Sequence, residues 1–339
     1  MSVTGQFTTF QDLYTGVLNA VRSQTTQAST VSQAKRAVNI ALQDMHLGQD
    51  YQFYWAERNA TLILQPPYTT GTVSITTGTT ALTGVGTLWD TAGTYGVNNL
   101  VAGDKIVLAG TDVVYRVASV TDDTNAVLDS LYVGATLSGS SYTTFKDEYT
   151  PVSDYMRPVD MRFFDDNHEI QIVDRRQLRR KFPRNSVTGR PQAVAQIELG
   201  PSSNMGEPEL RPRLVFTPPP DAVYNIPYTY ITNNLVCCSN GVFHTEFTLD
   251  SDEPIVPFRY RHALYYYALK IFYEHKDDVR AQQALQDYIS VMQRIVNDVS
   301  VGDQRLRIEP RQSHYTHHAE APYNYTSRFD VNNAFDRME

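Results

Sequence analysis

Three histidines near the C-terminus are of a residue type that metal ions prefer. His314, His317 and His318 follow the order His-x-x-His-His, and this spacing can bring two or three imidazoles to one ion. Glu320 is the nearest carboxylate, and no cysteine lies close by. The surrounding composition is typical of a solvated or contact-forming tail, so we expect no bound metal.

A second group has the composition of an acid–base site. Asp165, Asp166 and Glu169 surround His168, and such a group can transfer protons when it lies in a cleft. The same residues also fit a solvated turn between two strands. The sequence has no GxGxxG, Walker A, HExxH, CxxC or GxSxG motif, which are the common cofactor, metal and nucleophile signatures. We therefore expect no catalytic residue and no cofactor.

The strongest charge feature is a basic run that follows an acidic one. The basic run holds seven cations: Arg175, Arg176, Arg179, Arg180, Lys181, Arg184 and Arg190. The acidic stretch holds eight carboxylates: Asp147, Glu148, Asp154, Asp160, Asp165, Asp166, Glu169 and Asp174. The basic run could contact a phosphate backbone, form a solvated face, or meet the acidic face of an identical subunit. We favour the subunit contact, made by residues 175–181, because neighbouring opposite charges suit a head-to-tail ring.

Composition limits the class of protein. The chain has 339 residues, 41% of them hydrophobic, and a net charge of -8, so it can bury a large core and should not bind nucleic acid in general. No secretion signal or membrane-length apolar run is visible. Cys237 and Cys238 are adjacent, which is a poor geometry for a disulfide. We expect a protein made in a reducing cytoplasm, without contact to a membrane.

Helical periodicity opens and closes the chain. Apolar residues recur at helical spacing in four segments: 10–21, 30–47, 260–271 and 279–296. Thr30 and Gln33 fit a capping box at the start of the second segment. These segments predict a helical hairpin at each end of the main domain.

Strand patterns fill the region between the hairpins. Aromatic and β-branched residues predict strands over 51–64 and from 149 to 231. Residues 69–142 are dominated by Thr, Gly, Ser, Val and Ala, with Lys105 and Arg116 as the only basic residues. This shift predicts a small all-β domain, barrel or sandwich-like, inserted into an α+β core formed by residues 1–68 and 143–301.

The last segment, 302–339, is polar and carries scattered aromatic residues. They are Tyr315, Tyr323, Tyr325, Phe329 and Phe335. We expect an extended tail, with a reach of roughly 110 Å at about 3.3 Å per residue. Since a permanently disordered tail would seldom hold so many aromatic residues, we expect these five to dock on partner subunits.

A resemblance to a known family rests on short segments in a fixed order. The first are Val-Asn-Ile-Ala-Leu-Gln-Asp-Met (38–45), Trp-Ala-Glu-Arg (55–58), Arg175-Arg176 and Thr-Gly-Arg-Pro (188–191). Leu-Val-Phe-Thr-Pro-Pro-Pro-Asp (214–221) and Tyr-Thr-Tyr (228–230) follow, and then Asp-Glu-Pro-Ile-Val-Pro (252–257) before Arg259, Ala263 and Leu264. In their order and spacing these segments resemble the head-to-tail connector, or adaptor, proteins of tailed bacteriophages.

The resemblance implies a structural virion protein. Twelve copies would form a ring in the neck, below the portal protein, continue the DNA channel, and present a docking surface for tail, nozzle or tail-tube proteins. Genomic DNA would pass through without sequence-specific binding. The inserted domain is similar to small β-domains of phage neck and tail proteins, and could contact fibres.

Two other functions stay open. A tail or fibre-associated protein would use the inserted domain to bind a sugar on a host surface or another virion component, and it would form a trimer. An enzyme would use a site around Asp165, His168 and Glu169.

Overall fold

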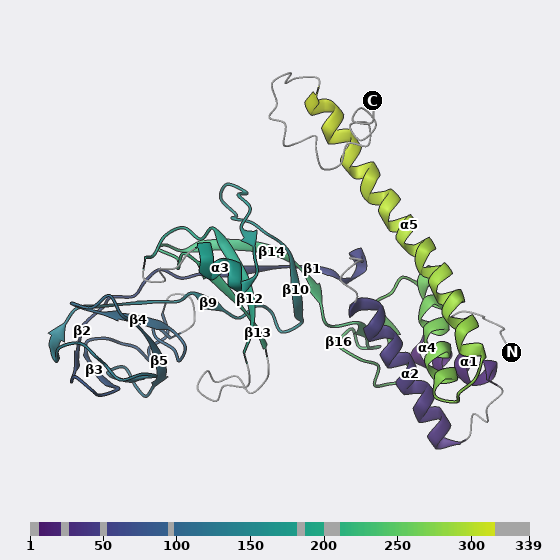
Figure 1. Ribbon diagram of the computed structural model, residues 1–339, viewed down its shortest axis with the longest axis horizontal. Coiled ribbons are helices and arrows are strands. Elements are labelled where there is room, and N and C mark those ends of the chain that lie inside the picture. The colour runs from purple at the N-terminus through teal and green to yellow at the C-terminus, as the bar shows by residue number, and fades with distance from the viewer. Residues whose placement is uncertain are drawn as a thin grey trace. The chain divides into compact units, whose positions relative to one another are not determined.

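The protein combines helices and antiparallel sheets, which confirms the α+β class. The computed structural model describes residues 7–21, 27–47, 53–93, 98–181, 187–199 and 211–315. Two compact units divide the chain (Figure 1). The helical unit is formed by Met1–Trp55 and Leu235–Glu339, and the β unit by Ala56–Asn234.

The helical unit is built from two helical hairpins. Its helices are α1 (Phe10–Ala20), α2 (Ala28–Leu47), α4 (His262–Glu274) and α5 (Arg280–Tyr315). Helix α4 contacts the other three, because it buries residues such as Ala263, Leu264 and Ala268 on several sides. Helix α2 begins at Ala28, so the expected capping box of Thr30 and Gln33 does not cap it. A capping box is present at α1 instead, where Thr9 is the N-cap and pairs with Asp12.

The expectation of an extended tail from residue 302 is wrong for its first part. Helix α5 continues through Tyr315, since Gln304, Arg305, Leu306 and Arg307 are good helix formers that outweigh Gly302. The 36 residues of α5 span about 54 Å, whereas the 13 residues of α4 span about 20 Å. Much of α5 therefore extends past the helix that it packs against.

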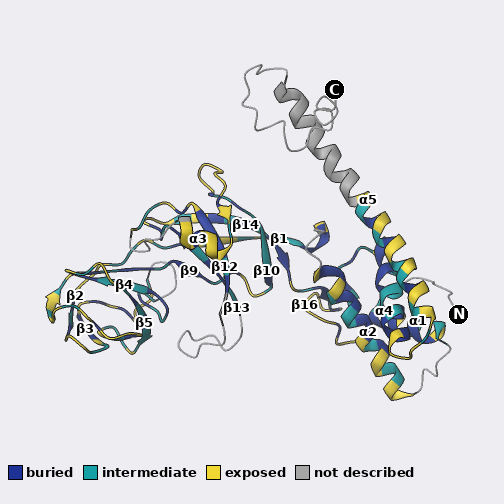
Figure 2. Ribbon diagram, viewed as in Figure 1, coloured by how far each residue is buried: buried dark blue, intermediate teal, exposed yellow. Residues whose placement is uncertain are grey.

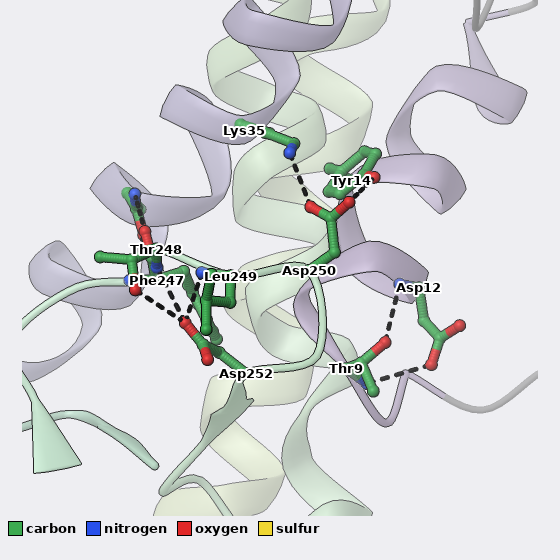
Figure 3. A network of polar contacts seen from close by, with 10 residues as sticks. Thr9, Asp12, Tyr14, Lys35, Phe247, Thr248, Leu249, Asp250 and Asp252 are labelled. Atoms are coloured by element: carbon green, nitrogen blue, oxygen red, sulfur yellow. Dashed lines mark hydrogen bonds and ion pairs between the residues drawn. The ribbon is translucent and has the colours of Figure 1, made fainter. Parts of the chain in front are cut away.

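The loop between β16 (Phe243–His244) and β17 (Glu253–Pro254) holds the start of α1 (Figure 3). The buried Asp252 carboxylate accepts the backbone N–H groups of Thr248 at 2.9 Å and Leu249 at 2.7 Å. The Asp252 carbonyl accepts the N–H of Phe10, and the Asp250 carbonyl that of Gln11. Since the first N–H groups of a helix lack partners within it, this loop completes the α1 cap.

Side chains of α1 and α2 fix the same loop. Lys35 lies 2.6 Å from one Asp250 oxygen, and the Tyr14 hydroxyl donates to the other at 3.2 Å. Asn39 donates to the Phe247 carbonyl and accepts its N–H. The side-chain contacts of Tyr14, Lys35 and Asn39 with this loop therefore join residues that lie more than 200 positions apart in the chain (Figure 3).

The β unit contains a sandwich of two sheets with a shared core. One sheet has the order β1 (Glu57–Leu64), β14 (Tyr224–Thr232), β10 (Tyr155–Met161). The other has the order β11 (Gln171–Ile172), β12 (Ala193–Leu199), β13 (Arg211–Thr217), β9 (Glu148–Tyr149). Alternation along β14 places Ile226, Tyr228 and Tyr230 in this core, where they join Leu214 and Phe216 of β13.

A third sheet of the β unit, spanning residues 72–145 and called the barrel module, curls into a half-barrel. Its strands are β2 (Thr72–Ile75), β3 (Ala81–Val85), β4 (Lys105–Leu108), β5 (Val114–Val120), β6 (Asn125–Leu128), β7 (Leu137–Ser140) and β8 (Tyr142–Phe145). The order is β7-β2-β3-β6-β5-β4-β8. Because β7 and β8 are successive parts of one segment, the two ends of the sheet meet in that segment. The core is centred on Trp89 and Tyr132.

Glycine is required at one position of strand β3, Gly84. A Cβ at Gly84 would lie 2.3 Å from the Thr87 hydroxyl oxygen, and Thr87 is fully buried. The Thr-Gly-Val-Gly-Thr segment (83–87) thus lets the backbone approach a buried side chain closely.

Candidate subunit-contact surface

Helix α3 (Arg175–Lys181) carries most of the predicted contact residues. Leu178 is buried and packs on Ala193 and Ala195 of β12. Asp174 accepts the N–H of Arg176 at 3.0 Å and so caps the helix. The side chains of Arg175, Arg176, Arg179 and Arg180 are exposed, and Figure 2 shows the helix as largely exposed.

The four arginines of α3 lack carboxylate partners within the described part of the chain. Arg175, Arg176, Arg179 and Arg180 are all exposed, and none of them joins an ion pair there. Two pairs, 175 with 179 and 176 with 180, stand at i,i+4 spacing, where like charges destabilise a helix by about 0.2–0.5 kcal/mol per pair. This exposed positive charge would be relieved by an acidic partner.

The acidic stretch, in contrast, is mostly engaged inside the chain. Asp147 and Glu148 pair with Lys105, Asp154 accepts the Tyr230 and Thr232 hydroxyls, Asp160 pairs with Arg162, Asp166 pairs with Arg190, and Asp174 caps α3. Asp165 and Glu169 remain exposed beside this set. The acidic half of the expected contact is therefore smaller than the sequence indicates.

Arg190 belongs to a different site from α3. It donates to both oxygens of Asp166 at 2.7 Å, and its guanidinium lies 4.1 Å from the centre of the Phe163 ring. The pair borders an open pocket of about 670 Å³. The lining residues are Asp166, His168, Glu169, Gln171, Arg190, Pro191, Gln192 and Ala193. The structure thus brings three of the four residues of the predicted acid–base cluster to one pocket.

The electrostatics of this pocket do not favour proton transfer by Asp166. The Arg190 guanidinium beside it holds the pKa of the Asp166 carboxyl below its usual range, and Asp166 raises the pKa of Arg190 in return. A general acid or base works best with a pKa near the working pH. Asp166 is instead held as a charged partner of Arg190.

A buried charge cluster, which sequence reasoning missed, joins the barrel module to β9. Asp104, Lys105, Lys146, Asp147 and Glu148 are all largely buried there. Lys105 pairs with Asp147 and lies 3.5 Å from Glu148, and Lys146 lies 4.0 Å from Asp104. Burial raises the pKa of Asp104 to about 6. No local signal marks this group, because its members come from two segments, 104–105 and 146–148, that lie about 40 residues apart in the chain.

The structure describes no side chain for the remaining predicted contact residues. Lys181 ends α3 and Tyr315 ends α5, and only their backbones are described. Tyr323, Tyr325, Phe329 and Phe335 lie outside the described residues, as do His317 and His318. Within the described ranges, no three His, Cys, Asp or Glu side chains gather as metal ligands.

Among the described helices, none is both long enough and apolar enough to cross a bilayer. Comparison with known proteins finds no family model and no curated sequence that matches the chain.

Proposed function

We propose that this chain is the head-to-tail adaptor of a tailed bacteriophage and forms a ring, of twelve copies, below the portal. The observation that carries the proposal furthest is the exposed positive face of α3. Four guanidinium groups without carboxylate partners in the described chain are held on a helix that is anchored by Leu178. Such a face suits repeated contact with an acidic surface.

A ring supplies that surface in each neighbouring copy. Asp165 and Glu169 are exposed carboxylates of the same unit, so a head-to-tail arrangement could bring them to the α3 arginines of the next copy. The resemblance described above gives the ring its place in the virion neck. The net charge of -8 suits a channel through which DNA slides.

The proposed partners follow from that position. The portal protein would lie above the ring, and tail, nozzle or tail-tube proteins would dock below it. Fibres could contact the barrel module. The ring would be assembled in the host cytoplasm.

Charge reversal tests the contact. The variant Arg175→Glu/Arg179→Glu should weaken ring formation roughly 30-fold or more, because a lost interfacial charge pair typically costs about 2–5 kcal/mol. Its thermal transition should stay close to that of the wild type, since both side chains are exposed. Mass photometry and electron microscopy of the tagged chain, purified alone and from infected cells, give the readout.

The matched control reverses Arg36 and Arg294, two exposed arginines of the helical unit. It makes the same change in charge and should leave rings intact. Equal loss of rings in both variants would point to bulk charge instead of the α3 contact. Rings unaffected by the α3 changes would refute the contact, and a tagged chain found at fibre tips or bound to no viral component would refute the adaptor function.

A further inference from the structure

Strand β1 is a long strand at the edge of its sheet. Its eight residues pair with β14 over their full length, from Glu57 opposite Ile231 to Leu64 opposite Tyr224. On its other side, no backbone hydrogen bond reaches β1 from any described residue. In an antiparallel ladder, alternate N–H and C=O groups point away from the partner, so β1 presents a row of groups that another strand can pair with.

The apolar core of the sandwich ends at β1 without full cover. Leu64 is fully buried, but Ala60 and Leu62 on the same face are only partly buried. The opposite face carries three exposed residues, the polar Asn59 and Thr61 and the apolar Ile63. An added strand would fit best with apolar side chains on the core face and polar ones on the other.

The C-terminal segment 323–331 has this pattern. Tyr323, Tyr325, Phe329 and Val331 stand at alternate positions, with Ser327 between them. The intervening residues are Asn324, Thr326, Arg328 and Asp330, all polar. Such alternation over nine residues is the pattern of a strand with one buried face, and the length matches the eight residues of β1.

We infer that residues 323–331 of one copy add as a further strand to the free edge of β1 in a neighbouring copy. The aromatic side chains cover Ala60 and Leu62, and the polar ones lie beside Asn59 and Thr61. Backbone hydrogen bonds supply affinity and the alternating side chains supply register. The neighbouring copy is the acceptor because the proposed ring sets identical chains side by side. This inference rests on the proposed ring.

Cysteine cross-linking tests which copy provides the edge. In a Cys237→Ser background, chains with Thr61→Cys are assembled with chains carrying Asn324→Cys, Thr326→Cys or Arg328→Cys. These tail positions share the polar face, so at least one should lie near Thr61. We expect a disulfide between the two kinds of chain in assembled rings. The control position, Val85→Cys on the barrel module, is 68% exposed and should give none.

Two cross-linking results would overturn the inference. One is intact rings without any link to Thr61→Cys. The other is a link that forms only within a single chain when Thr61→Cys and Thr326→Cys are combined, since the tail would then bind its own β1.

Hydrogen exchange of residues 57–64 provides a second test. The variant Tyr323→Ser/Tyr325→Ser/Phe329→Ser should exchange these amides about tenfold faster or more in the assembled state, because it removes the buried face of the added strand. The control Asn324→Ser/Thr326→Ser/Arg328→Ser keeps that face and should exchange like the wild type. If both variants form rings and their β1 amides exchange like those of the wild type, the added strand is overturned while the adaptor function stands. Absence of rings even for the wild type in infected cells would overturn the adaptor function.

Discussion

Asp104 is a carboxylate held where charge is disfavoured. It lies at the base of the barrel module, 7% exposed, with Lys146 at 4.0 Å and the N–H of Val101 donating to it at 3.0 Å. These contacts do not offset burial, which raises its pKa to about 6. Burial also raises the pKa of neighbouring Asp147, although Lys105 opposes the shift. The module is thus joined to the sandwich through groups that favour a proton.

The pH dependence of stability should reveal this residue. Because the folded pKa of Asp104 lies above its usual 3.8, the folded state binds the proton more tightly. This proton binding by Asp104 stabilises the folded state at low pH, and the stabilisation is lost as the pH rises from about 4 through about 6. Replacing Asp104 with Asn removes this titration. Relative to wild type, the free energy of unfolding of the variant should therefore rise by up to about 3 kcal/mol between pH 4 and pH 7.5.

Denaturant unfolding at both pH values measures this difference. The control Asp112→Asn changes an exposed carboxylate of the same module and should follow the wild type. Identical pH dependence in all three proteins would show that Asp104 is not the group responsible.

At the scale of elements, α1 depends on a loop distant in sequence. The carbonyls of Asp250 and Asp252 complete its cap, and the Asp252 side chain holds the loop in shape. Local sequence cannot supply these partners, since the two segments are joined only in the folded unit. The strength of the cap therefore depends on tertiary packing.

Two aspartates of this loop should differ in their contribution to stability. The change Asp252→Ala leaves the N–H groups of Thr248 and Leu249 without their buried acceptor, and we expect it to lower the free energy of unfolding by about 2–4 kcal/mol. The change Asp250→Ala removes a half-exposed ion pair with Lys35 and should cost about 1 kcal/mol or less. Denaturant unfolding of both variants checks the order; equal losses would contradict the role given to Asp252.

At the scale of the whole molecule, the chain crosses between its two units at two neighbouring places. The crossings follow Trp55 and Asn234, and the strands that begin and end there are paired, with Glu57 opposite Ile231. The β unit is therefore one continuous segment with cores of its own. The helical unit is completed by both ends of the chain.

Each unit should fold without the other. Residues 56–234, expressed alone, should unfold in a cooperative thermal transition and keep the circular dichroism of a β protein. A second protein, in which a short Gly-Ser linker replaces residues 56–234 between Trp55 and Leu235, should be helical and unfold cooperatively. Loss of cooperative unfolding in either piece would show that its core depends on the other unit.

Local patterns predicted much of the secondary structure. The apolar spacing of α1, α2 and α4 and the alternation in β14 follow from contacts within a few residues, so they are visible in sequence. Prediction failed at two helix ends: Thr30 and Gln33 do not cap α2, and α5 continues past residue 302, where an extended tail was expected.

The sequence by itself determined the α+β class and the basic character of 175–181, because composition and periodicity are local properties. Only the tertiary structure decided which charges have partners. Arg190 pairs with Asp166 while the α3 arginines do not pair within the described chain, and Asp104 is buried between strands. It also decided that β7 and β8 close one sheet while β1 remains at the edge of another. Pairing of charges and strands depends on residues far apart in sequence meeting in space, which no local pattern records.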